Sequence, residues 1–159
     1  MKKINFIIIL IVFLSSLGAL AQSFDEDRII LGNFVQRLYT NSPFEGCRII
    51  DDYDNSYLLS VVALDETKYK TRSALNRISQ VKSQRNAGEF LNGTQSFSEF
   101  IIKTQKSEEK GLTKDFSETM ECIKTNSTGY VQQMQLLTSF KDSDGLTVFI
   151  YFKELKTDL

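Results

Sequence analysis

The stretch of residues 68–85, KYKTRSALNRISQVKSQR, contains six basic side chains and no acidic one. A basic run of this kind can bind an anionic group, or it can form the solvated side of a helix. The candidates for an anion-binding surface are Lys68, Lys70, Arg72 and Arg77. The phosphates of an envelope polyanion, such as lipopolysaccharide, would be a suitable ligand for them.

The apolar residues of the same stretch predict how a helix there would be oriented. At 100° per residue, four of them fall on one side and predict the buried face: Ala74, Leu75, Ile78 and Val81. The basic residues are spread around the axis, and Lys82 and Arg85 fall on the apolar side, where their aliphatic stems can cover hydrophobic surface. This pattern favours a solvated helix, with the anion-binding surface as the alternative.

The chain has two cysteines, Cys47 and Cys122. In an oxidising compartment they could form a disulfide. The bond would close a loop of about 75 residues and stabilise the fold by about 4 kcal/mol in the chain-entropy account. The alternative is two separate buried thiols, which pack as small hydrophobic groups.

The sequence contains no histidine, which excludes Ser–His and Cys–His nucleophile pairs and removes the commonest metal ligand. The S-x-x-K pattern occurs twice, at residues 79–82 and 107–110, without the K-T-G partner motif of serine acyl enzymes. The acidic residues around Asp51 and Asp52 are typical of a hairpin turn, and the loop lacks the glycine and distal glutamate of an EF-hand. We therefore predict no catalytic residue, cofactor or metal site, with a small hydrolase that uses no histidine as the remaining enzymatic alternative.

Residues 1–21 have the three parts of a secretory signal peptide. Lys2 and Lys3 precede an apolar run at residues 4–14, and Ala19 and Ala21 provide an A-x-A-like cleavage site. The apolar run is shorter than the roughly 20 residues that span a bilayer. We expect cleavage after Ala21, no stable membrane span afterwards, and a periplasmic or secreted bacterial protein.

Cleavage would leave residues 22–159, a length that suits a single domain. It would remove Lys2 and Lys3, so the basic count falls from 19 to 17 against 20 acidic residues, and the net charge becomes −3. Nucleic-acid binding needs a cationic surface to neutralise phosphates. Charge and export together therefore argue against a nucleic-acid partner.

The order of the predicted elements indicates an α+β fold. We expect an N-terminal helix at about 25–40, a hairpin of strands at about 47–53 and 57–64, and a long helix that Asp65 and Thr67 cap and that ends near Leu91. A strand near 94–105, a short helix near 116–123 and a C-terminal hairpin with its turn at Asp144–Gly145 follow. The predicted architecture is an antiparallel sheet of about five strands, with one long and one short helix packed on a face, plus the N-terminal helix.

The segment at about 57–154 resembles the lipoprotein-20-like family, which also covers the N-terminal domain of the flagellar assembly protein T. The similarity lies in the small residues of the long helix, the GEFLNG at its end, the strand SFSEFIIKT, and the closing strand GLTVFIYFKEL. The resemblance implies an envelope-associated α+β domain with a binding or structural role and no active-site residues. This chain lacks the lipidated cysteine of the lipoprotein members.

The sequence therefore predicts an exported, non-catalytic domain of the cell envelope that acts as a structural or interaction module. Its partner would be an envelope protein or a surface polymer. The alternative is a binder of an envelope polyanion or of a small ligand.

Overall fold

The computed structural model of the protein describes residues 26–52, 55–93, 100–103, 123, 125 and 127–155. The chain divides into two compact units, Met1–Pro43 and Phe44–Leu159. In the first unit the described residues form a helix at 26–41, as predicted, with Leu31, Val35 and Tyr39 buried along one side. That spacing of four residues is the one expected for a helix with one apolar face.

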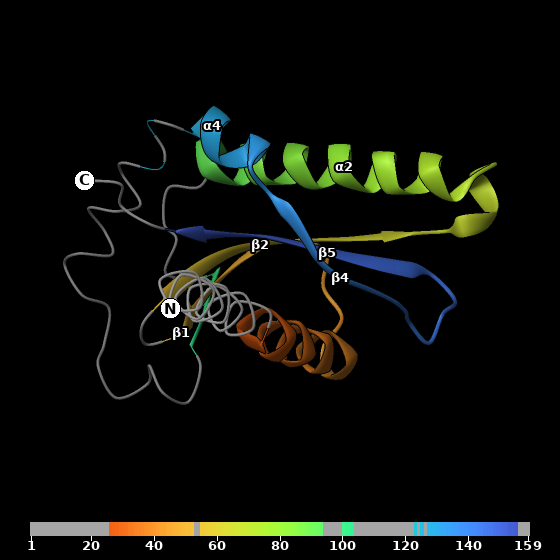
Figure 1. The fold of residues 1–159 in the computed structure, drawn as a ribbon, viewed down its shortest axis with the longest axis horizontal. Helices are drawn as coiled ribbons and strands as arrows, with labels where there is room; N and C mark the ends of the chain where they lie inside the picture. The colour runs from red at the N-terminus through yellow and green to blue at the C-terminus, as the bar shows by residue number, and fades with distance from the viewer. Residues whose placement is uncertain are drawn as a thin grey trace, which may run out of the picture. The chain divides into compact units, whose positions relative to one another are not determined.

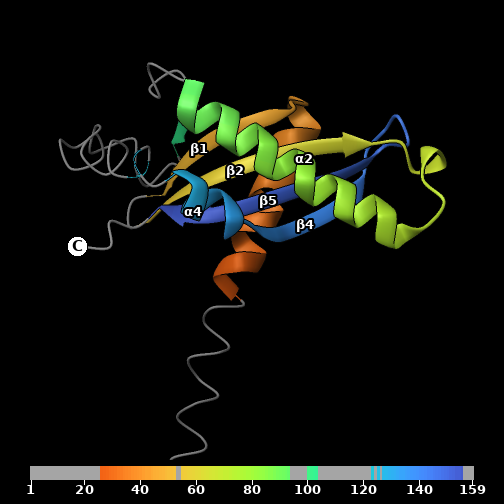
Figure 2. The same cartoon turned by 90° about the horizontal axis from the view of Figure 1, so that it is seen from above.

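The second unit is an α+β sandwich of one sheet and its helices (Figure 1). The sheet has five strands in the order β3-β1-β2-β5-β4, and the fold class agrees with the prediction. The elements are β1 (Gly46–Asp52), β2 (Asn55–Leu64), η1 (Glu66–Lys68), α2 (Arg72–Gly93), β3 (Ile101–Lys103), α4 (Ser127–Gln132), β4 (Gln135–Lys141) and β5 (Thr147–Leu155). Helices α2 and α4 lie side by side over the same face of the sheet (Figures 1 and 2).

Three of the four strand pairings are antiparallel, and they include both predicted hairpins. In the first hairpin Asp52 pairs with Asn55, so the second strand begins at Asn55 and not at about 57 as predicted. The fourth pairing corrects the prediction further, because β3 runs parallel to β1 and has only three residues. The alternation of side chains identifies a strand, but it does not encode the direction from which the chain enters the sheet.

The connection from β2 to the long helix also differs from the prediction. Asp65 caps the short helix η1, where its Oδ1 accepts hydrogen bonds from the backbone N–H and the hydroxyl of Thr67. Helix α2 begins only at Arg72, and the hydroxyl of Thr71 caps it by accepting a bond from the Ala74 N–H at 3.1 Å. The sequence predicted one helix that starts after Asp65, whereas the structure has two helices, η1 and α2, each with its own N-terminal cap.

The predicted buried face of α2 is partly wrong. The side chains that are buried follow one another at intervals of four residues: Leu75, Ser79, Ser83, Ala87 and Leu91. Val81, which was assigned to the buried face, is 58% exposed. The error arose because three of the five buried residues are small, and two of those are serines that count as polar in a hydrophobic pattern.

Small residues suit this face because the helix contacts the sheet directly, and the Ser79 hydroxyl and the Ser83 carbonyl find hydrogen-bond partners there. The Ser79 hydroxyl donates to the carbonyl of Asn76 at 2.7 Å, so the Tyr151 hydroxyl of β5, 2.8 Å away, donates to Ser79. The Ser60 hydroxyl of β2 donates to the backbone carbonyl of Ser83 at 3.2 Å. Each buried polar group that is satisfied in this way avoids the cost of desolvation without a hydrogen bond.

The strands under the helix are buried over most of their length. Residues Leu58–Val62 of β2 and Thr147–Phe152 of β5 are all buried, which explains why both segments are nearly continuous apolar runs in the sequence. The core cluster joins these strands to Leu75, Ala87 and Leu91 of α2.

The structure has a short helix, α4, at Ser127–Gln132, where the sequence predicted none. The helix predicted near 116–123 stays a prediction, because residues 104–122 lie outside the described residues. Tyr130 and Val131 of α4 pack against the core cluster. The C-terminal hairpin turn is confirmed: Gly145 has φ 79°, and Oδ1 of Asp142 accepts bonds from the N–H groups of Asp144 and Leu146.

Within the described part of the chain, no helix is both long enough and apolar enough to cross a membrane.

The corrected orientation of α2 predicts opposite results for two apolar residues of the same helix. Leu91→Ala should lower the free energy of unfolding by about 2–5 kcal/mol, because Leu91 is fully buried. Val81→Ala should change it by no more than about 0.5 kcal/mol, because Val81 is mostly exposed. Urea unfolding followed by circular dichroism measures both, and equal losses would contradict the orientation described.

Candidate functional site

The structure separates the four basic residues of the predicted anion-binding surface into two pairs. Lys68 lies in η1, 3.9 Å from the carboxylate of Asp65, and Arg72 lies close enough to Glu66 to lower the pKa of that carboxyl. Lys70, in the connector before α2, and Arg77, on α2, are exposed and form no ion pair within the described part of the chain. The second pair has no such acidic neighbour and is the better candidate for binding an external anion.

The pKa of Glu66 is lowered chiefly by residues other than Arg72. The largest cause of its lowered pKa is the hydroxyl of Thr147, which donates to its Oε1 at 2.6 Å, followed by Lys141, whose Nζ is 3.0 Å from Oε2. These contacts tie η1 to β4 and β5. Glu66 therefore has a structural role, because it connects η1 to the C-terminal hairpin, and its negative charge also offsets that of Arg72.

Other basic residues join Arg77 on the side of α2 that faces away from the sheet. We call Arg77, Val81, Lys82 and Arg85 the outer face of α2. The outward direction of the helix is taken as the one opposite Ser83, at the centre of the buried side. Val81 and Arg85 lie about 20° from this outward direction. Arg77 lies about 60° from it and Lys82 about 80°. All four residues are exposed. The basic residues therefore share a side of the helix, which the wrongly placed buried face had hidden.

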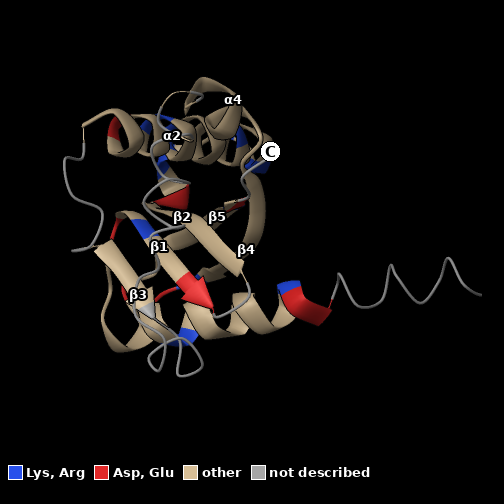
Figure 3. Cartoon of the chain, turned by 90° about the vertical axis from the view of Figure 1, so that its left-hand side faces the viewer, with Lys and Arg blue, Asp and Glu red and all other residues tan. Residues whose placement is uncertain are grey.

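The outer face is positively charged as a whole. Helix α2 contains four basic residues and a single acidic one, Glu89, in a chain of formal net charge −1 (Figure 3). Arg85 and Glu89 form an exposed ion pair with a distance of 2.7 Å between Nε and Oε1. Among the described residues no acidic side chain pairs with Arg77 or Lys82. The outer face consequently keeps two unpaired cations on either side of exposed Val81.

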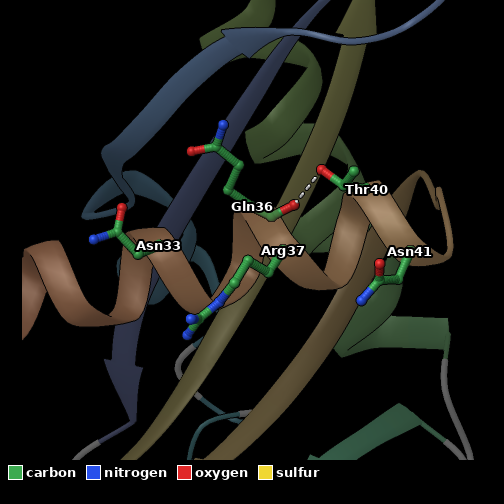
Figure 4. Close-up of a pocket in the computed structure, with 5 residues that line it drawn as sticks. All are labelled: Asn33, Gln36, Arg37, Thr40 and Asn41. Carbon is green, nitrogen blue, oxygen red and sulfur yellow. Dashed lines mark hydrogen bonds between the residues drawn. The ribbon is translucent and has the colours of Figure 1, made fainter.

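A hollow of about 480 Å³ lies on the helix at 26–41 (Figure 4). Its lining residues are polar and come from one side of that helix: Asn33, Gln36, Arg37, Thr40 and Asn41. All five are exposed, and the Thr40 hydroxyl donates to the carbonyl of Gln36 within the same helix. Among the described residues that line it, none is a buried polar group that could orient a ligand.

The Cys47 side chain is a buried free thiol on β1, directly opposite Ser60 of β2. Burial raises the pKa of the Cys47 thiol to about 12, while the hydrogen bond with Ser60 and the charge of Arg48 act in the opposite direction. Because only the thiolate is an effective nucleophile, this rise in pKa lowers the expected reactivity of Cys47 at neutral pH. Cys122 lies outside the described residues, so the disulfide between the two stays a prediction.

The acidic residues at the tip of the first hairpin do not form a metal site within the described residues. No group of three or more His, Cys, Asp or Glu side chains there lies close enough together to hold an ion. Asp51 accepts a hydrogen bond from the Ser56 hydroxyl at 3.4 Å across the hairpin. Asp51 and Asp52 both lie within β1, whose end carries these acidic residues in Figure 3.

Comparison with known proteins gives no match: the chain is matched by no family model, no curated protein and no solved structure. The resemblance to the lipoprotein-20-like family therefore stays a prediction, and the function has to be argued from the residues themselves.

The burial of Cys47 predicts slow reaction with thiol reagents. In a Cys122→Ser variant, Cys47 is the only thiol. At pH 8 its reaction with 5,5′-dithiobis(2-nitrobenzoate) should be roughly 1,000-fold slower in the folded protein than in urea, because the pKa rises from 9.0 to about 12 and lowers the thiolate fraction. A folded rate within about tenfold of the unfolded one would contradict a buried thiol.

A separate measurement, the number of free thiols in denatured protein, tests the predicted disulfide. Wild-type protein, denatured without reductant, should show no free thiol if Cys47 and Cys122 are bonded. Two thiol equivalents per chain would exclude the bond, and reduction before labelling gives the reference value of two.

Proposed function

We propose that this protein is an exported, non-catalytic module of the cell envelope that binds an anionic surface polymer through the outer face of α2. The observation that carries the proposal is the accumulation of exposed cations on one helix of a net acidic chain. A polymer with repeated phosphate or carboxylate groups can contact several of these cations at once. Multiple contacts compensate for the small contribution of each exposed charge pair.

The arrangement of the outer face supports a repeating ligand. Arg77 and Arg85 are eight residues apart, which corresponds to about 12 Å along the helix axis. Lys82 lies between them along the chain, and the exposed side chain of Val81 provides an apolar contact at the centre of the face. Neighbouring charged groups of one extended polymer can span this distance.

The non-catalytic part of the proposal is supported by the chemistry of the chain. There is no histidine to act as a general base, and the thiol of Cys47 is buried with a strongly raised pKa. Export is supported by the three-part pattern of residues 1–21.

The test is retention on a polyanion at increasing salt concentration. Wild-type protein should be retained on immobilised heparin and on lipopolysaccharide, and it should elute earlier as salt screens the charges. The double variant Arg77→Gln/Lys82→Gln should elute at a distinctly lower salt concentration, because it removes the two unpaired cations of the outer face.

The matched control is Arg37→Gln/Lys153→Gln. It also removes two positive charges, one from the exposed Arg37 and one from the half-buried Lys153. It should elute close to the wild type. An equal shift for both double variants would show that retention follows net charge and not the outer face. Absence of wild-type retention at low salt would overturn the polymer-binding proposal.

A further inference from the structure

A cation that the basic run does not include, Arg48, lies in an aromatic environment at the β3 edge of the sheet. The central carbon of its guanidinium is 5.2 Å from the ring centroid of Phe44 and 5.4 Å from that of Phe100. Phe100 in turn meets Phe90 of α2 edge-on, with centroids 5.4 Å apart and an interplanar angle of 88°. Two phenyl rings from different segments therefore contact one charged group, and a third ring supports one of them.

The sheet explains how these residues come together. Ile49 of β1 pairs with Ile101 of β3, so the residues just before them, Arg48 and Phe100, are neighbours at the same edge. Side chains alternate along a strand, so Arg48 and the buried Cys47 point to opposite faces of β1. β3 pairs with only Ile49–Asp51, and Arg48 lies just before the first of these pairs.

Within the described residues, most of the hydrogen-bonding capacity of the Arg48 guanidinium is unused. A guanidinium has five N–H donors. Arg48 donates from Nη1 to the carbonyl of Cys47 at 2.9 Å, and within the described residues no carboxylate pairs with it. The side chain is half-buried, so it has lost part of its hydration. A cation in this state is poised to accept an anion.

We propose that Arg48 is a binding site for a carboxylate group attached to an apolar residue or chain, with the carboxylate on the free N–H groups and the apolar part on the rings of Phe44 and Phe100. The planar fork of a guanidinium matches the two oxygens of a carboxylate in a bidentate contact. The cation–π contacts restrict the side chain before the ligand arrives, which lowers the entropic cost of binding.

The aromatic surroundings select a carboxylate over a phosphate. A phosphate near neutral pH carries more charge and loses more hydration when it approaches phenyl rings. A carboxylate has a single charge and can be joined directly to apolar carbon atoms that the rings cover. The ligand is thus an organic acid, either as a small molecule or as an acidic side chain of a peptide next to apolar residues. This site is independent of the outer face of α2, which is proposed to bind a polymer.

The experiment follows the Nε–Hε resonance of Arg48 in ¹⁵N-labelled protein, with that of Arg77 as an internal control. The probes are sodium butyrate, its uncharged analogue butyramide, and inorganic phosphate, all at constant ionic strength. Butyrate should shift the Arg48 resonance saturably, with a midpoint about tenfold below that of Arg77, while butyramide should leave it unchanged. Equal midpoints for Arg48 and Arg77, an equal response to butyramide, or a lower midpoint for phosphate than for butyrate would each overturn the proposal.

A second pair of probes distinguishes the two sources of the carboxylate. These are the capped peptides acetyl-Val-Glu-Val-amide and acetyl-Val-Gln-Val-amide. Tighter binding of the glutamate peptide than of butyrate supports a peptide ligand, and the reverse order supports a small organic acid. Binding of the two peptides with equal affinity would overturn the site, because they differ only in the carboxylate.

Two variants test the bidentate contact between the Arg48 guanidinium and a carboxylate. Arg48→Lys keeps the charge but removes the bidentate geometry, and it should weaken butyrate binding about tenfold, as read from the backbone amides of Cys47 and Ile49. Arg37→Lys, at an exposed position of the helix at 26–41, should leave butyrate binding unchanged. Unaltered binding in Arg48→Lys would overturn the bidentate contact.

Discussion

The fold of the second unit depends on the direct contact between α2 and the two central strands, β2 and β5. Helix α2 places small side chains against the sheet. The hydroxyl of Ser79 forms a hydrogen bond with Tyr151 of β5, and the backbone carbonyl of Ser83 accepts one from the Ser60 hydroxyl of β2. These bonds fix the rotation of the helix about its axis, because a different rotation would bury hydroxyls and carbonyls without partners. Ser83 shows the cost of such close packing, since its own hydroxyl is buried without a partner.

The same rotation decides which residues of α2 reach solvent. Once Ser79, Ser83 and Ala87 face the sheet, Val81 and Arg85 must face away from it. Arg77, Lys82 and Arg85 then lie within about 80° of the outward direction of the helix, so these three cations share its solvent side. The packing of small residues is thus the physical cause of the candidate binding face.

Two neighbouring residues of β1, Cys47 and Arg48, lie in different surroundings. Cys47 faces the core beside Ser60, and burial lowers the expected reactivity of its thiol, whereas Arg48 carries its charge on the other side of the strand against phenyl rings. The alternation of a β-strand therefore separates a group of low reactivity from one that can bind. Pairing with a short parallel strand brings Phe100 beside Arg48, and no pattern in the local sequence around either residue points to the other.

The sequence by itself determined the α+β class, both hairpins and the Asp144–Gly145 turn, because alternation and turn residues act over a few neighbouring positions. It also identified Arg77 as a candidate contact. Only the tertiary structure decided the rotation of α2, the separate start of that helix at Arg72, the parallel strand β3 and the surroundings of Arg48. Each of these depends on which distant segment supplies a partner, and a small or polar residue such as Ser83 is buried only because the opposite surface accommodates it.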